Sequence, residues 1–152
     1  MTKVVFFRSG GVFYGFEEQG HTGFAEEGND ILCAALSAMT MLIINTVEVA
    51  YASDVEYTID DKTTDIRVRS KAALVEFEAD ERKRYAVSGI FLSYYYQLNE
   101  LLEEYYDYLD VEVRDVDYNW RRGIDVQKIT TFKKIKLYKN YRNYGGTNYV
   151  KT

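Results

Sequence analysis

The sequence contains a single cysteine and a single histidine, Cys33 and His21, twelve positions apart. A thiol and an imidazole together can perform cysteine-based acyl transfer. The imidazole removes the thiol proton, the thiolate attacks a carbonyl carbon, and the imidazolium protonates the leaving amine. One cysteine excludes an internal disulfide, which favours a reducing compartment. It also excludes zinc sites built from several Cys and His ligands, so we expect neither a metal nor a cofactor.

Cys33 lies near the start of an apolar segment, 30–51, that is rich in helix-forming residues. If Asn29 caps this helix, Cys33 is its fourth residue; if Asp30 caps it, Cys33 is its third. The free backbone N–H groups of that turn favour the thiolate, whereas neighbouring carboxylates favour the thiol, so the direction of the pKa shift stays open. Because the segment has no polar face, we expect a central helix that is buried between layers.

Both residues also have a plain structural interpretation. A cysteine in an Ala-rich helix commonly serves as a small hydrophobic residue. A histidine that follows a glycine, as His21 follows Gly20, is commonly an ordinary loop residue. The spacing of the two residues does not decide between these interpretations and catalysis.

The remaining pattern predicts the elements that would position this pair. Alternating apolar residues indicate strands, and apolar steps of three and four indicate an amphipathic helix. The predicted order is β-β-α-β-β-α-β, an α+β fold with one main, mostly antiparallel sheet and two helices. The predicted helices are 30–51 and 81–108, and the predicted strands are 3–8, 12–19, 54–60, 64–69, 73–79 and a last one around Val111 and Val113. The strand at 73–79 is either separate or continuous with 64–69 through a bulge.

Charge is unevenly distributed along the 152 residues, whose net charge is −5. Residues 117–152 carry nine Lys and Arg against two acidic residues, so residues 1–116 are strongly acidic. We therefore predict a domain at 1–116 and a basic, Tyr-rich C-terminal extension at 117–152. Aromatic and basic side chains together suit RNA contact; the alternatives are docking on the acidic domain or on a dimer partner, and disorder.

No basic-then-apolar leader opens the chain, and we find no apolar run of the roughly 18 residues that a membrane span needs. These features predict a cytoplasmic protein without a membrane partner.

The string from Gly20 to Ala38 reads G-H-T-G-F-A-E-E-G-N-D-I-L-C-A-A-L-S-A. It closely resembles the signature of the ribosomal-processing cysteine protease family, Prp. In that family the pattern is G-H-x-G, then A-x-x-G-x-D-I-hydrophobic-C-A-A-hydrophobic-S. The resemblance extends more loosely over residues 1–116 and stops before the basic extension.

The resemblance implies that Cys33 is the nucleophile and His21 the general base. It also implies an α+β fold, a homodimer, and removal of the N-terminal extension of ribosomal large-subunit protein 27 during ribosome biogenesis. Among the other motif residues, Asp30 is expected either to orient His21 or to cap the helix, and Ser37 to bond within the site or to a helix carbonyl. The loop glycines are candidates for substrate binding or plain loop residues: Gly20, Gly23 and Gly28.

Two alternatives to a ribosomal-protein protease remain. One is a phage or mobile-element relative that trims a capsid or scaffold protein. The other is a non-catalytic module that binds the ribosome or its RNA through residues 117–152, although such a module has no need of both Cys33 and His21.

Overall fold

A glycine turn joins the first two strands of the sheet. The computed structural model describes residues 1–21, 30–60 and 63–119, all within the first of two units, Met1–Arg122. Strands β1 (Thr2–Ser9) and β2 (Val12–Gln19) pair antiparallel through Gly10 and Gly11, whose φ angles are +56° and +85°. Such positive angles suit glycine and the tight turn of a hairpin. The predicted hairpin is confirmed.

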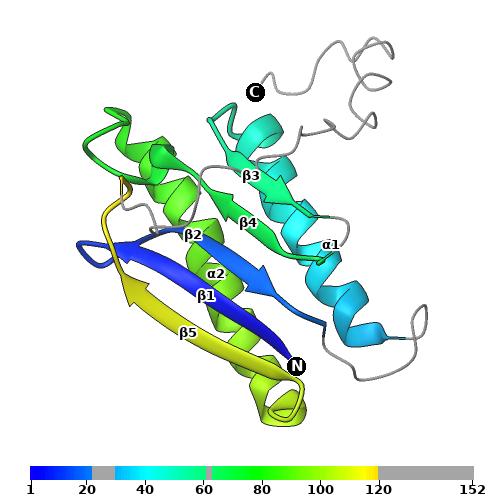
Figure 1. The fold of residues 1–152 in the computed structure, drawn as a ribbon. Coiled ribbons are helices and arrows are strands. Elements are labelled where there is room, and N and C mark those ends of the chain that lie inside the picture. Colours follow the sequence, from blue (N-terminus) through cyan, green and yellow to red (C-terminus); the bar gives the residue numbers. More distant parts are fainter. Residues whose placement is uncertain (22–29, 61–62, 120–152) are drawn as a thin grey trace, which may run out of the picture. The chain divides into compact units, whose positions relative to one another are not determined.

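Five strands form one sheet in the order β3-β4-β2-β1-β5 (Figure 1). Strands β3 (Glu56–Ile59), β4 (Ile66–Arg69) and β2 pair antiparallel, whereas β5 (Leu109–Asp115) runs parallel to β1. A parallel neighbour needs a crossover, which α2 supplies here. The α+β fold with a mostly antiparallel sheet is thus confirmed.

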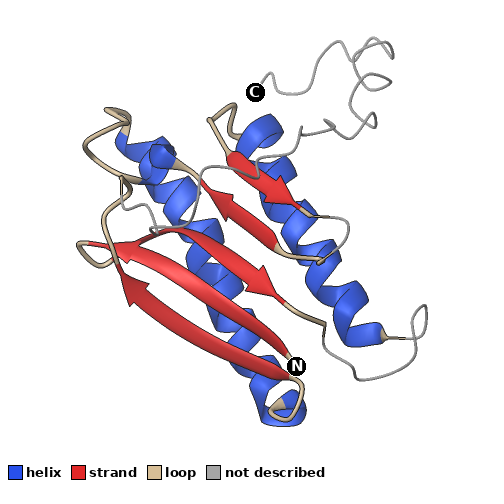
Figure 2. Ribbon diagram, viewed as in Figure 1, coloured by secondary structure: helices blue, strands red, loops and turns tan. Residues whose placement is uncertain are grey.

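Both helices, α1 (Ile31–Asn45) and α2 (Glu81–Tyr105), cover the same face of the sheet (Figure 2). The core lies between this face and the helices, where the Phe6 and Phe16 rings of the sheet contact Tyr94 of α2. Phe91 of α2 packs against Phe16 as well. The amphipathic period predicted for 81–108 therefore buries one side of α2.

Two predictions about local structure are wrong. Residues 73–79 form no strand: a short 3-10 helix, Lys71–Ala73, is followed by turns, because Ser70 bonds the Ala72 N–H and turns the chain after β4. The long apolar helix is not buried all round either. It changes to a π-helical turn at Thr46–Ala50, and Leu42 on its outer side is 59% exposed.

By length and composition, the segment Ile31–Ala50 is nevertheless apolar enough to span a membrane. This corrects our expectation that the chain has no segment of that kind. Its inner side packs on the sheet, where Ile43, Ile44 and Val47 are buried. An apolar core helix meets the same criterion, so this feature is weak evidence for a membrane span.

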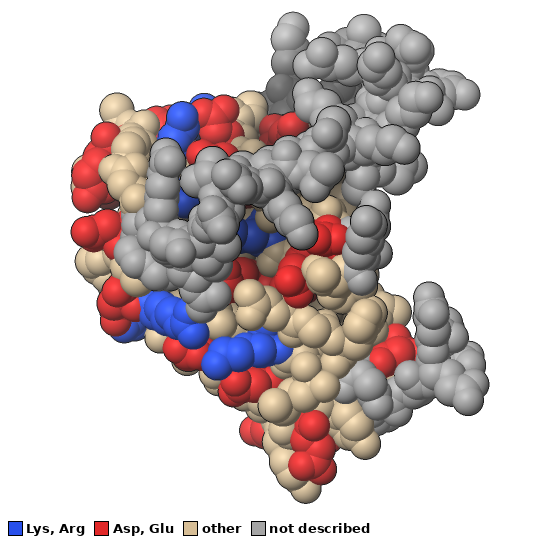
Figure 3. Space-filling view, viewed as in Figure 1, with Lys and Arg blue, Asp and Glu red and all other residues tan. Residues whose placement is uncertain are grey.

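The other face of the sheet carries charged side chains in pairs. Lys3 binds Glu112, and Arg69 binds Glu56, with N–O distances of 2.7 and 2.8 Å. Basic and acidic groups accordingly alternate over this face (Figure 3). Since successive strand residues point to opposite faces, Glu17 lies here beside Arg67, and Glu18 lies on the helix-covered face.

Candidate active site

Asp30 places Cys33 in the first turn of α1. The Asp30 backbone is extended, and its carboxylate accepts a hydrogen bond from the Cys33 N–H at 2.9 Å. This is the N-cap geometry, in which a side-chain oxygen bonds an otherwise unpartnered N–H group. Cys33 is therefore the third residue of the helix, and the capping role considered for Asp30 is the one that the structure displays.

The surroundings of Cys33 favour the thiol over the thiolate. Its partial burial is the largest cause that raises its pKa, and the charges of Asp30 and Glu18 raise the pKa further. The sequence left this direction open; in the structure, burial and two carboxylates raise the pKa of the thiol. A nucleophilic Cys33 consequently needs a base to remove its proton.

His21 lies just beyond the end of β2 and is exposed. Gly20 before it has a φ of +81°, a conformation that side-chain-bearing residues rarely adopt. The His21 Nε2 atom lies 3.3 Å from the Thr64 hydroxyl. Among the described residues, no hydrogen bond joins the His21 ring to the Cys33 thiol.

The contact with Thr64 indicates which ring nitrogen carries the proton. The Thr64 hydroxyl donates to the Thr63 carbonyl at 2.6 Å, so its oxygen is left to accept from His21. In the tautomer that fits this hydrogen bond, Nε2 carries the proton and the lone pair lies at Nδ1. Nδ1 is the atom available to accept a proton.

Cys33 borders a cleft of about 260 Å³ that opens at this end of the sheet. Thr64, the contact of His21, lines the same cleft, whereas the His21 ring itself is not among the lining residues. The lining comes from β1 and the end of β2, from α1, and from the facing ends of β3 and β4: Thr2, Glu18 and Gly20; Cys33, Leu36 and Ser37; Ile59, Asp60, Thr64 and Ile66.

The other candidate site residues are placed unequally. Gly20 and Ser37 both line the cleft, with Ser37 one turn after Cys33. The Ser37 hydroxyl makes no hydrogen bond to another described residue, so neither predicted role for it is observed. Gly23 and Gly28 lie outside the described residues, as does nearly all of the predicted extension, 117–152.

Sequence reasoning missed Glu18, which is only 4% exposed and lines the same cleft. Its Oε1 atom accepts hydrogen bonds from the Tyr94 hydroxyl at 2.6 Å and the Thr40 hydroxyl at 2.7 Å. Burial raises the pKa of this carboxyl against the opposing effect of both hydroxyls. The signal was present in the sequence, because the apolar alternation of β2 places position 18 on the same face as Phe16.

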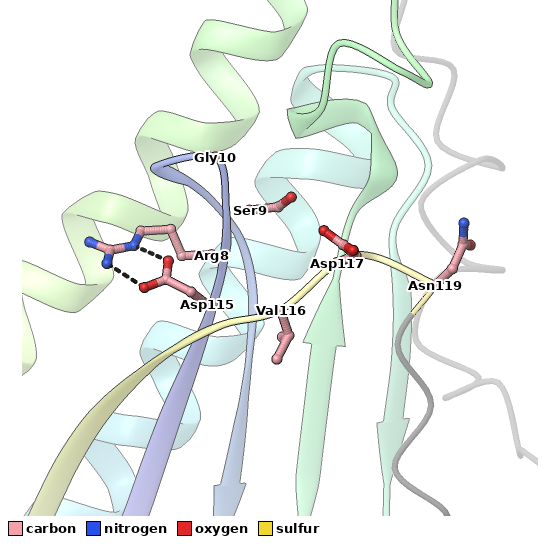
Figure 4. Close-up of a pocket in the computed structure, with 7 residues that line it drawn as sticks. All are labelled: Arg8, Ser9, Gly10, Asp115, Val116, Asp117 and Asn119. Carbon is pink, nitrogen blue, oxygen red and sulfur yellow. Dashed lines mark hydrogen bonds and ion pairs between the residues drawn. The ribbon is translucent and has the colours of Figure 1, made fainter.

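A larger cavity of about 580 Å³ lies at the opposite end of β1 (Figure 4). Arg8 and Asp115 form a two-bond ion pair on one side of it, at 2.7 and 2.8 Å. The residues that line it include neither Cys33 nor Glu18. The chemistry therefore belongs to the smaller cleft.

Comparison with protein families identifies the family of the chain. A family model described as cysteine protease Prp matches residues 1–110, which include His21 and Cys33. The chain belongs to this family. The Prp resemblance of the Gly20–Ala38 string is thereby confirmed, and the protein is a cysteine protease. A comparison with curated proteins gives no significant match.

Solved structures share the fold. The ribosomal processing protease Prp from S. aureus, in complex with a covalently linked product peptide, matches with a TM-score of 0.63 and 20% identity over 75% of this chain and 100% of that one. Its complex with a substrate peptide matches with a TM-score of 0.60 and 19% identity, over 75% of this chain and 100% of that one. SMU.848 from Streptococcus mutans matches with a TM-score of 0.60 and 22% identity, over 76% of this chain and 99% of that one. At such low identity the likeness establishes the fold.

Proposed function

We propose that this Prp-family protein is an endopeptidase in which Cys33 is the nucleophile and His21 the general base. The observation that carries the proposal is that the sole cysteine and the partner of the sole histidine, Thr64, line one cleft. The family match adds to it, since cysteine proteases require such a pair.

The reaction proceeds through a thioester. His21 Nδ1 takes the Cys33 proton as the sulfur bonds to the peptide carbonyl carbon, and the carbonyl oxygen becomes an oxyanion. The imidazolium then protonates the leaving amine as the C–N bond breaks. Water, deprotonated by His21, attacks the thioester, and the acid product and the free thiol are released.

Two features support this division of roles. The raised pKa of the Cys33 thiol keeps it protonated in the resting enzyme, so the histidine has a proton to remove. The ring must come within hydrogen-bond distance of the sulfur for that step. Gly20 next to it gives the backbone access to conformations closed to other residues.

We further propose that the substrate is the precursor of ribosomal large-subunit protein 27, cut after its N-terminal extension. The family supports ribosomal processing, and the S. aureus protease was solved with a substrate peptide. A cytoplasmic homodimer and RNA contact through residues 117–152 belong to the same proposal. The family model ends at residue 110 and does not cover the extension. A second candidate is therefore a phage or mobile-element relative that processes a capsid or scaffold protein.

The test is incubation of the full chain with a bacterial protein 27 precursor, read by mass spectrometry. We expect one cut that removes the extension, and its loss after iodoacetamide, which has only Cys33 to alkylate. The variant His21→Ala should be equally inactive, whereas Ala34→Ser, at the exposed neighbour of Cys33, should cleave normally. Cleavage of capsid or scaffold precursors alone would reject the ribosomal substrate, and cleavage by alkylated enzyme would reject the nucleophile.

A further inference from the structure

Thr64 combines a strained backbone with a contact to the candidate base. Its φ angle is +59°, in the left-handed region. A β-branched residue is rarely found there, because its Cβ substituents crowd the backbone, and glycine or asparagine is the usual occupant. Such strain persists only where the surrounding structure holds the residue in place, and it is concentrated at functional sites. A functional role of the side chain would account for a threonine at this position.

The sheet places Thr64 beside His21. Strands β2 and β4 pair antiparallel, and their register continued past the end of both strands puts Thr64 opposite Gly20, the residue before His21. The Thr64 N–H donates to the Asp60 carbonyl at 2.7 Å, a main-chain bond across the loop that joins β3 to β4. The Thr64 hydroxyl is therefore carried by backbone that the sheet and this bond hold in place.

The Thr64 hydroxyl meets the ring as an acceptor. Its proton goes to the Thr63 carbonyl at 2.6 Å, and its oxygen lies 3.3 Å from His21 Nε2. Within the described residues, this is the hydrogen bond that the ring makes. Nε2 carries a proton both in this neutral tautomer and in the imidazolium, so the bond can persist while Nδ1 gains and loses a proton.

We propose that Thr64 is the positioning residue of the base: its hydroxyl oxygen holds His21 by Nε2 and leaves Nδ1 to exchange a proton with Cys33. This inference rests on the proposed function, since it takes His21 as the general base. The ring needs such an anchor because Gly20 permits backbone conformations that are closed to other residues. In the triad of serine proteases a carboxylate orients the histidine and selects its tautomer. Thr64 performs both tasks without adding a negative charge.

The kinetic test compares cleavage of the protein 27 precursor by the full chain and its variants. Thr64→Val keeps the shape of the side chain but removes the oxygen, whereas Thr64→Ser keeps the oxygen. We expect kcat to fall roughly three- to tenfold in Thr64→Val, as for one lost hydrogen bond, with KM little changed. Thr64→Ser should stay near the wild-type kcat. The control is Thr58→Val, which removes an exposed hydroxyl from β3 of the same hairpin and should leave kcat unchanged.

The variant Thr64→Gly separates positioning from stability. Glycine adopts the positive φ without strain, so this variant should melt at the wild-type Tm or above it. It also lacks the oxygen, so its kcat should fall as that of Thr64→Val does. A residue with a purely structural role would not lower kcat when its replacement leaves the fold as stable as before.

Motion of the ring gives a readout that needs no substrate. His21 is the sole histidine, so NMR relaxation of its ring carbons is assigned without ambiguity. The ring should be more mobile on the ps–ns timescale in Thr64→Val and Thr64→Gly than in the wild type and Thr64→Ser.

Wild-type kcat in folded Thr64→Val and Thr64→Gly would overturn the inference, as would a ring that is equally mobile in all the variants. A higher kcat would overturn it as well, because Thr64 would then hold the ring away from Cys33. Failure of the proposed function gives a different result. Cleavage by His21→Ala at the wild-type rate would contradict the general base, and the ring measurement would still decide whether Thr64 anchors His21.

Discussion

Asp30 performs two separable tasks, and a pair of substitutions distinguishes them. Its side chain caps α1 through the Cys33 N–H, and its charge raises the pKa of the Cys33 thiol. Asparagine caps helices as well as aspartate does but has no charge, whereas alanine supplies neither a cap nor a charge. The variants Asp30→Asn and Asp30→Ala should therefore differ in stability and agree in thiol chemistry.

The magnitudes follow from the cap. Loss of an N-cap side chain costs about 1 kcal/mol, which corresponds to roughly 3–5 °C in Tm for a domain of this size. We expect Asp30→Ala to melt that much lower than the wild type and Asp30→Asn to melt within about a degree of it. Differential scanning calorimetry at one pH provides the comparison.

The electrostatic part is measured by the rate of iodoacetamide alkylation as a function of pH. A nearby negative charge favours the protonated thiol, so its removal lowers the pKa of Cys33. Both variants should reach half-maximal alkylation at a lower pH than the wild type does. Cys33 is the sole cysteine, which makes the profile unambiguous.

Three outcomes would refute this reasoning. If Asp30→Ala is as stable as the wild type, the capping bond contributes no stability. If the alkylation midpoint of Asp30→Asn does not move down, the charge does not act on the thiol. If Asp30→Asn folds normally but loses cleavage, Asp30 acts on His21, the alternative that the sequence left open.

Further predictions concern Glu18, two glycines and Thr64. Burial raises the folded-state pKa of Glu18, so the wild type loses stability as the pH rises above the ordinary Glu range towards that raised value. Glu18→Gln should not show this loss. Denaturant unfolding should therefore give the variant a free energy of unfolding that exceeds the wild-type value by an amount that grows with pH. A difference that shrinks as the pH rises would contradict a raised pKa for Glu18. A Cβ atom on Gly15 would lie 2.6 Å from the Val68 carbonyl oxygen, so Gly15→Ala should cost about 1–3 kcal/mol, whereas Gly89→Ala, with open space in α2, should be neutral or stabilising. Equal unfolding midpoints for the two variants would contradict the packing of β2 against β4. Thr64→Val should remove the preference of the His21 ring for Nε2 protonation, seen in its ¹⁵N chemical shifts, and a wild-type ring protonated mainly at Nδ1 would refute the tautomer assignment.

The sequence predicted most of the fold because local rules dominate there. The first hairpin followed from alternation and from Gly10-Gly11, and the long helix α2 followed from its apolar steps. Residues 73–79 were misassigned because Val75 and Phe77 alternate as in a strand, yet both are exposed and no neighbouring strand pairs with them in the described part of the sheet. Alternation alone cannot provide the hydrogen-bonding partner that a strand needs.

The candidate site was predictable only in part. Cys33 and His21 stood out as the sole members of their residue types, and the Gly20–Ala38 string carried the family resemblance. The sign of the Cys33 pKa shift depended on burial and on Glu18, which approaches from another element of the fold. The exposed apolar side of α1 was missed as well, because composition cannot tell which side of a uniformly apolar helix meets the sheet.

The central claim is that Cys33 forms the covalent bond to the substrate. It is tested most directly by the rate at which Cys33→Ala cleaves the protein 27 precursor, measured beside the wild type at equal concentration of folded protein. The account predicts a rate lower by about 10³-fold or more, because loss of a nucleophile removes the covalent pathway. A Cys33→Ala rate within tenfold of the wild type would contradict it.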